Sequence, residues 1–289
     1  MVWTGPACFY IFGSVGFLWF AAWQVYAEDA PLDDKGAAAR EEGVWAQLRG
    51  QGKMAGRMLS SKCVWAITVC HWCSGVGAYI GLAWFPTYFS TVWGVPRAQL
   101  GLTVLPCKLL VAAAPVASSS GTPHSKKLLR SDVCVIPASA AMGLATDRLV
   151  AHYGLLHARK LVNTVGFGAS AVLWLMVPMS ASPMAALGGV CAALTVHVAV
   201  YGGYEASKLD IAAPEHVGLL QSLVNTMANT SGLVAVPLAA WIVERKPEDG
   251  EIGGGALAGW DGVFRMMAAL FLAAAAAYLG WATEERLFT

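Results

Sequence analysis

The sequence predicts an all-α, polytopic membrane protein, and composition and the lengths of its apolar runs carry that prediction. Of its 289 residues, 57% are hydrophobic and only 13% are charged, about half the charged fraction of a typical soluble domain. The apolar residues gather in runs of roughly 20, enough to cross about 30 Å of hydrocarbon as a helix. Lipid offers backbone groups no hydrogen-bond partner, so the spans should be helical. A net charge of +1 gives no reason to expect a nucleic-acid partner.

The apolar runs predict roughly seven spans. They are residues 7–26, 63–89, a split region within 99–146, 161–180, 184–204, 217–243 and 262–283. Because no lysine or arginine precedes the first run, we interpret it as a span rather than a signal peptide. Residues 27–62 are polar and charged and should form a loop outside the bilayer.

The third region is unusual because charged residues interrupt it. Residues 101–106 and 135–143 would make one reasonable span if they were joined, but 107–134 lie between them and carry Lys108, Lys126, Lys127 and Arg130. Each cation would cost roughly 3 kcal/mol inside a span. The segment 107–134 is therefore expected outside lipid, either as an unusual insertion or as an artefact of gene modelling such as an unspliced intron.

The distribution of basic residues predicts the orientation of the spans. Eleven lysines and arginines fall on one side and three on the other, and the richer side of a membrane protein is normally cytoplasmic. The richer side receives Lys35, Arg40, Arg49, Lys53, Arg57, Lys62, Arg148, Arg159, Lys160, Lys208 and Arg286, and the other receives Arg97, Arg245 and Lys246.

Several stretches, in this order along the chain, resemble the anion:cation symporter branch of the major facilitator superfamily, which includes sodium–phosphate, vesicular glutamate and plant plastid anion transporters. FYIFGSVGFLWFAAW (9–23) looks like the sixth helix of that family, and CVWAITVCHWCSGVGAYIGLAWFPTYF (63–89) like the seventh. Gly143, Asp147 and Arg148 fit the G-x-x-x-D-R loop pattern of the superfamily. KLDIAAPEHVG (208–218) is similar to the loop between helices ten and eleven, and WDGVF (260–264) to the entry of helix twelve.

The resemblance implies an incomplete major facilitator fold. That fold has two six-helix halves with the substrate cavity between them, and the chain matches one helix of the first half and all six of the second. Residues 1–26 would then end the N-terminal half, 27–62 would be the cytoplasmic central loop, and 63–289 would form the C-terminal half, with its insertion at 107–134. Some relatives that carry organic anions have an arginine where this chain has Ser74, which argues against glutamate-like substrates.

Two interpretations are open for Gly143, Asp147 and Arg148. Gly143 permits a close helix approach, and the two charged residues can pair with neighbouring helix ends in one state of a transport cycle. Contacts that exist in one state only would bias an inward–outward equilibrium, which makes the three residues a candidate gate. The alternative is a solvated, positively charged loop that only fixes the topology.

Polar residues inside the spans are candidates for the lining of a substrate cavity. His71 and Tyr79 fall on one face of the 63–89 helix, where they could donate to an anion or relay a proton, and Ser74 lies between them. Gln221, Asn225 and Asn229 repeat at every fourth residue. The alternative for both sets is hydrogen bonding that holds neighbouring helices together.

His197, Tyr201 and Glu205 lie one turn apart and could form a proton path, although a histidine packed on a helix face would produce the same pattern. Neither a catalytic cluster nor a metal site is expected, and no cofactor is expected beyond a coupling Na⁺ or H⁺.

The sequence thus predicts a secondary transporter of inorganic phosphate or small organic anions, with the lipid bilayer and a small anionic solute as partners. The rival prediction is a truncated, non-transporting remnant, or a half-transporter that needs a separate N-terminal half. Both the plastid envelope and the plasma membrane are open as its location.

Overall fold

The computed structural model describes residues 5–26, 44–96, 137–244 and 256–288, and within them all regular secondary structure is helical. The all-α prediction is therefore confirmed. The chain divides into two compact units, Met1–Gln51 and Gly52–Thr289. The segment 107–134 and the apolar residues 101–106 lie outside the described residues, so their assignment stays a prediction.

The first unit contains helix α1, Gly5–Tyr26. Its 22 residues include no charged side chain and extend roughly 33 Å, about the thickness of the hydrocarbon core. Trp19 and Trp23, one turn apart, stack with ring centroids 5.2 Å from each other. The helix begins two residues before the predicted first span and ends with it at Tyr26.

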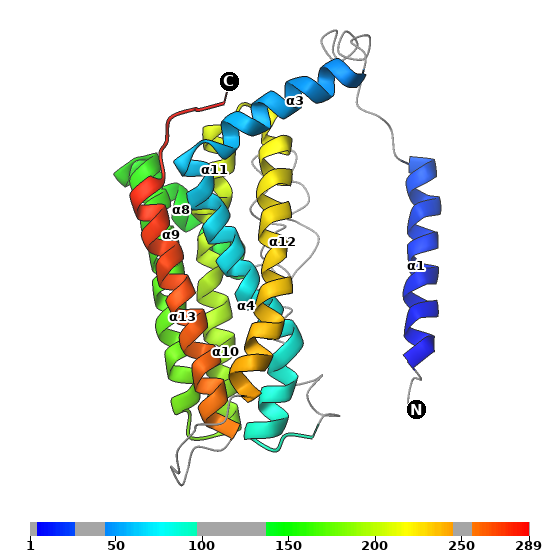
Figure 1. The fold of residues 1–289 in the computed structure, drawn as a ribbon, viewed down its shortest axis with the longest axis vertical. Helices are drawn as coiled ribbons and strands as arrows, with labels where there is room; N and C mark the ends of the chain where they lie inside the picture. The colour runs from blue at the N-terminus through cyan, green and yellow to red at the C-terminus, as the bar shows by residue number, and fades with distance from the viewer. Residues whose placement is uncertain (1–4, 27–43, 97–136, 245–255, 289) are drawn as a thin grey trace. The chain divides into compact units, whose positions relative to one another are not determined.

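The second unit is a helical bundle (Figure 1). Five of its helical segments are long and apolar enough to cross a membrane. They are Lys62–Val92, Leu155–Met179, Pro183–Ile211, Pro214–Glu244 and Gly259–Trp281. The protein is therefore an integral, multi-pass membrane protein.

These spans are built from six α-helices and two short 3₁₀ turns. The helices are α4 (Lys62–Val92), α9 (Leu155–Met176), α10 (Pro183–His197), α11 (Tyr204–Ile211), α12 (Pro214–Glu244) and α13 (Ala256–Trp281). The turn η1 (Val177–Met179) ends α9, and η2 (Val198–Gly202) joins α10 to α11. The sixth predicted span lies in α12, and the fourth and seventh overlap α9 with η1 and α13, ending one and two residues beyond them.

Two boundaries differ from the prediction in a way that matters for the site. α9 begins at Leu155, so the charged residues 157–160 are helical rather than part of a loop, and the chain reverses at Gly154, whose φ of 80° favours glycine. The span predicted to end at residue 204 continues through α11 to Ile211. The loop predicted over 208–218 is therefore wrong except at residues 212–213, because α11 continues to Ile211 and α12 begins at Pro214.

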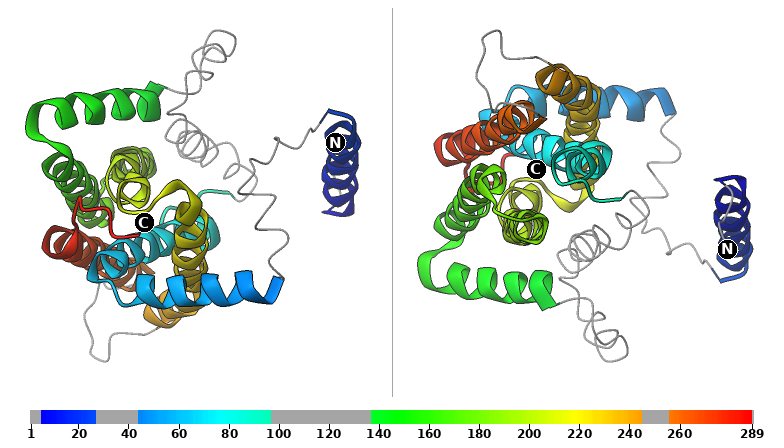
Figure 2. Two further views of the ribbon diagram at one scale, coloured as in Figure 1. Left: turned by 90° about the horizontal axis from the view of Figure 1, so that it is seen from above. Right: turned by 90° about the horizontal axis from the view of Figure 1, so that it is seen from below.

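α8 (Pro137–Tyr153) runs across the bundle rather than along it. It is seen lengthwise in both views of Figure 2, where α9, α12 and α13 are seen closer to end-on. α8 packs against α9 and η2. The second part of α3 (Val44–Leu59) packs Met54 and Met58 against the core of the bundle.

The core of the bundle is formed by α4 against α12 and α13, and by α9 against α13 and α10. Aromatic rings fill it near the C-terminal part of α4. Trp174 stacks on Phe264 with centroids 5.9 Å apart, and Tyr88 meets Phe264 edge-on at 5.2 Å, arrangements that aromatic quadrupoles favour.

Small residues allow the helices to approach closely elsewhere. A Cβ added to Gly75 of α4 would lie 2.4 Å from Ser231 Oγ of α12. A Cβ on Gly166 of α9 would lie 2.7 Å from Val200 Cγ1 and 3.0 Å from the Val200 backbone nitrogen. Such contacts supply the van der Waals packing that holds membrane helices together.

Gly166→Ala should therefore destabilise the bundle, because the added methyl pushes η2 away from α9. Overpacking of this kind costs about 1–3 kcal/mol, which thermal unfolding in detergent by intrinsic tryptophan fluorescence would detect. Gly168→Ala is the matched control, because nothing lies within 4 Å of a Cβ there. Equal melting temperatures for the two variants would contradict the close approach.

Candidate functional site

A cavity of about 250 Å³ opens among the spans of the bundle. Its walls come from α4, α9, α10, η2, α11, α12 and α13, so segments far apart in the sequence meet around it. The lining residues are His71, Ser74, Gly75, Gly77, Ala78, Tyr79, Trp174, Leu194, His197, Val198, Tyr201, Tyr204, Asn229 and Phe271. The volume lies just below the roughly 300–1,000 Å³ of sites for drug-sized ligands and suits a small solute.

One polar wall of the cavity lies between α4 and α12. The Tyr79 hydroxyl donates to Asn229 Oδ1 at 3.1 Å. Gly232 of α12 fixes the tyrosine ring from the other side, since a Cβ there would lie 3.0 Å from Tyr79 Cγ. The phenol and the amide thus form a hydrogen-bonding pair at the edge of the space that a solute would occupy.

His197 contributes a second polar group, at the junction of α10 and η2. Its Nε2 lies 3.0 Å from Ser74 Oγ of α4. The imidazole stacks on Phe271 with centroids 4.7 Å apart and meets Phe167 edge-on at 5.1 Å. Its Nδ1 is buried and has no hydrogen-bond partner among the described residues. Buried polar atoms are normally paired, so this nitrogen is available to a water or a solute in the cavity.

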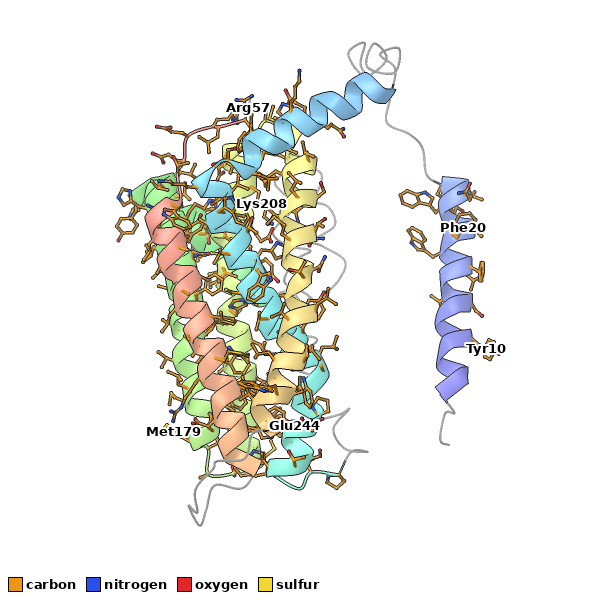
Figure 3. All side chains as sticks on the ribbon, viewed as in Figure 1. Tyr10, Phe20, Arg57, Met179, Lys208 and Glu244 are labelled. Carbon is orange, nitrogen blue, oxygen red and sulfur yellow. The ribbon has the colours of Figure 1, made fainter. Side chains whose placement is uncertain are left out.

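A charge cluster of His71, Glu205 and Lys208 lies beside the cavity. The Lys208 ammonium donates to Glu205 Oε2 at 2.8 Å, and His71 Nδ1 lies 3.5 Å from Glu205 Oε1 and 3.4 Å from Lys208 Nζ. Lys208 is only 2% exposed, and its Nζ lies 5.6 Å from the centroid of the Tyr204 ring. His71 is the member that lines the cavity. Figure 3 shows Lys208 within the bundle, farther from its end than Arg57.

Sequence reasoning missed Lys208, which was assigned to a loop. The structure corrects that assignment, because Lys208 belongs to α11 and is buried. A signal was present in the sequence: Glu205 and Lys208 are three residues apart immediately after an apolar run, and this spacing puts them on one helix face.

A second charged pair holds α11 to α9. Arg159 Nε donates to Asp210 Oδ2 at 2.9 Å, and its Nη1 donates to the Gly202 carbonyl at 2.9 Å. Sequence reasoning missed this pair too, because Arg159 counted only as a basic loop residue.

The C-terminal segment adds further contacts at the same end of the bundle. The Glu284 carboxylate accepts from the Leu156 backbone N–H, in the first turn of α9, at 3.2 Å. The Leu287 backbone N–H donates to the Ile211 carbonyl at 2.9 Å. The end of α11 is therefore fixed from two sides.

The structure brings together some of the candidate residues and leaves others apart. His71, Ser74, Tyr79, Asn229, His197 and Tyr201 line one cavity, and Glu205 reaches it through His71. Gln221 and Asn225 are exposed on α12 and do not line the cavity. Within residues 137–244, Gly143, Asp147 and Arg148 are exposed on α8, and neither charged side chain has an ion-pair partner in the described chain.

No group of three or more His, Cys, Asp or Glu side chains among the described residues could hold a metal ion. The polar groups that line the cavity are hydroxyl, amide and imidazole groups.

Several proteins named as transporters are similar to this chain over most of its length. The chain is 26% identical to the probable anion transporter 1, chloroplastic, of Oryza sativa subsp. japonica, over 98% of this chain and 47% of the relative. It is 26% identical to the sodium-dependent phosphate transport protein 1, chloroplastic, of Arabidopsis thaliana, over 98% of this chain and 49% of the relative. It is 25% identical to the vesicular glutamate transporter 1 of Xenopus tropicalis, over 83% of this chain and 40% of the relative.

These matches confirm the resemblance seen in the sequence. The chain is similar over most of its length to proteins named as anion, phosphate and glutamate transporters, and it spans about half the length, or less, of these relatives. The relatives are named as transporters and not as enzymes. No family model matches the chain.

Asp210→Asn should destabilise the bundle more than Asp261→Asn, although both variants remove an aspartate from an arginine pair. The Arg159–Asp210 side chains are only 16% and 18% exposed, whereas Arg265, which pairs with Asp261, is 71% exposed. An exposed pair contributes about 0–1 kcal/mol, and leaving a mostly buried arginine without its partner costs several times more. Thermal unfolding of the two variants in one detergent measures the difference, and equal losses would contradict this assignment.

Proposed function

We propose that this chain is the C-terminal part of a secondary anion transporter, and that its cavity forms one wall of the pathway for inorganic phosphate or a small organic anion. The observation that carries the proposal is the convergence of Tyr79, Asn229 and His197 on one cavity of about 250 Å³ inside a membrane bundle. A hydroxyl, an amide and an imidazole can all donate to the oxygens of an anion.

Homology supports the same activity. Relatives that cover nearly the whole chain are named as anion, phosphate and ascorbate transporters of chloroplasts. In this proposal coupling to Na⁺ or H⁺ drives uptake, and the two halves of the complete transporter rock about the cavity.

The exposed residues of α8 and α12 have roles in this proposal. Asp147 and Arg148 lie in the C-terminal part of α8, close in the chain to Arg159 in the first turns of α9, on the side proposed to be cytoplasmic. There they gate access by pairing with the other half in one state of the cycle. Gln221 and Asn225 extend the polar stripe of Asn229 toward the opposing half, where they complete the pathway.

The alternative is a chain that does not transport alone, either a truncated remnant or a half-transporter that functions with a separate N-terminal half. This alternative is considered because the chain matches less than half the length of several transporters. A cavity with walls from one half only would be open to lipid or water on the other side.

Uptake of radiolabelled phosphate into liposomes that contain the purified chain tests the proposal. We expect saturable uptake above protein-free liposomes when an inward H⁺ or Na⁺ gradient is imposed. Tyr79→Phe should weaken the apparent affinity by about tenfold, because the hydroxyl that now donates to Asn229 could no longer turn to donate to the anion, and one hydrogen bond to a charged group contributes about 1.5–3 kcal/mol. Asp147→Ala should abolish uptake without changing binding.

Asp261→Asn is the control for these variants, since its exposed pair lies away from the cavity. Absence of uptake by correctly inserted protein would contradict transport by the chain alone. Uptake that appears only when an N-terminal half of a relative is co-reconstituted would establish the half-transporter alternative.

A further inference from the structure

The charge cluster of His71, Glu205 and Lys208 has a geometry that structural ion pairing alone does not require. Both carboxylate oxygens of Glu205 are engaged, Oε2 by Lys208 at 2.8 Å and Oε1 by His71 at 3.5 Å. Lys208 is 2% exposed and lies in a membrane-length segment, Pro183–Ile211. A cation in such a place is costly unless it is paired, and such residues commonly mark solute or proton pathways.

The pairing of Lys208 depends on a single carboxylate. The nearest other acidic residue along α11, Asp210, is already paired with Arg159 at 2.9 Å. Glu205 is therefore the one described counter-ion within 4 Å of the Lys208 ammonium. If this carboxylate gains a proton, the buried ammonium loses its counter-charge and needs another anion.

His71 connects the lining of the cavity with this ammonium. His71 lines the cavity, and its Nδ1 lies 3.4 Å from Lys208 Nζ. One ring nitrogen thus faces both a donor and an acceptor. With Glu205 ionised, Nδ1–H donates to the carboxylate; with Glu205 protonated, the other tautomer accepts from it. The imidazole of His71 can therefore donate to Glu205 or accept from it, according to the charge of the carboxylate, without leaving the wall of the cavity.

We infer that Lys208 is the binding group for an oxyanion that enters from the cavity, and that Glu205 is its internal competitor, displaced by proton uptake. The inference rests on the proposed function and deepens it. A proton from the aqueous phase adds to a Glu205 carboxylate oxygen, the Lys208–Glu205 hydrogen bond breaks, and the ammonium donates to an oxygen of the anion instead. Loss of that proton restores the pair and expels the anion.

This exchange identifies H⁺ as the coupling ion. One proton and one anion occupy the cluster together, so neither site fills efficiently without the other. The coupling groups thus lie in the C-terminal half of the transporter, on α11 and α4, within the residues this chain contains.

Other titratable groups face Glu205 and bear on its response to pH. They are His71 on α4, Tyr201 on η2, and Tyr204 and Lys208 on α11 itself. Cys70 on α4 is electrostatically coupled to Tyr204. Arg159 on α9 forms an ion pair with Asp210. No recorded hydrogen bond or ion pair joins the cluster to a charged group on the described parts of α12 and α13.

Equilibrium binding to the purified full chain in lipid nanodiscs tests the inference, with radiolabelled inorganic phosphate and sulfate as probes. Sulfate keeps its charge between about pH 5 and about pH 8, so any change in its affinity reports on the protein. We expect wild-type affinity for sulfate to rise by about tenfold or more as the pH falls across this range. Lys208→Met should lose at least about tenfold in affinity for both probes, and Lys208→Arg should retain binding.

Glu205→Gln mimics the protonated state, so it should bind sulfate at neutral pH as tightly as the wild type does in acid. Because this variant leaves an unpaired ammonium, its folding is checked by thermal unfolding. Saturating sulfate should raise its melting temperature more than that of the wild type at neutral pH. Lys62→Met and Glu285→Gln, both at exposed positions, are the matched controls and should behave as the wild type.

Unchanged binding in Lys208→Met, or undetectable binding to the wild type, would overturn the site. A wild-type pH dependence in Glu205→Gln would overturn the competitor role. Binding requires no translocation, so the two proposals can fail separately. Binding that depends on pH without any uptake would contradict only the transport proposal. Uptake without binding that depends on Lys208 would contradict only this inference.

Discussion

Burying the ammonium of Lys208 in an apolar bundle is the constraint on which the arrangement around the cavity depends. The charge is tolerable because Glu205, His71 and the Tyr204 ring surround it. Those partners can meet only if α11 continues the α10 span and packs against α4. Arg159 then fixes α11 to α9 through Asp210. One buried charge thus accounts for the position of α11 and for the wall of the cavity beside it.

Close packing supplies the rest of the framework. Gly75 against Ser231 and Gly166 against Val200 let α4 meet α12 and α9 meet η2 without intervening side chains. Beside the close approach at Gly75, the same helices leave a space lined by hydroxyl, amide and imidazole groups. The cavity therefore results from the same spacing that stabilises the bundle, and a solute would meet groups whose positions are already set by packing.

The sequence anticipated much of this site but could not assemble it. Tyr79 and Asn229 were recognised because a polar residue inside an apolar run is costly in lipid, and the structure joins them by a hydrogen bond. Lys208 and Arg159 were assigned to loops, because hydropathy falls at charged residues even when the helix continues. Gln221 and Asn225 share the spacing of Asn229, yet only Asn229 of the three lines the cavity, since periodicity shows which residues share a helix face but not what that face contacts.

The sequence by itself determined the all-α class, the approximate position of the five membrane-length helical segments of the described chain, and the likeness to anion transporters. These follow from properties of contiguous residues: apolar length, charge and local motifs. Only the tertiary structure decided that His71 contacts Glu205 and Lys208, that His197 meets Ser74, and that α8 crosses the bundle. Such contacts join residues more than a hundred positions apart, and their existence depends on how helices pack, which no single segment of the chain encodes.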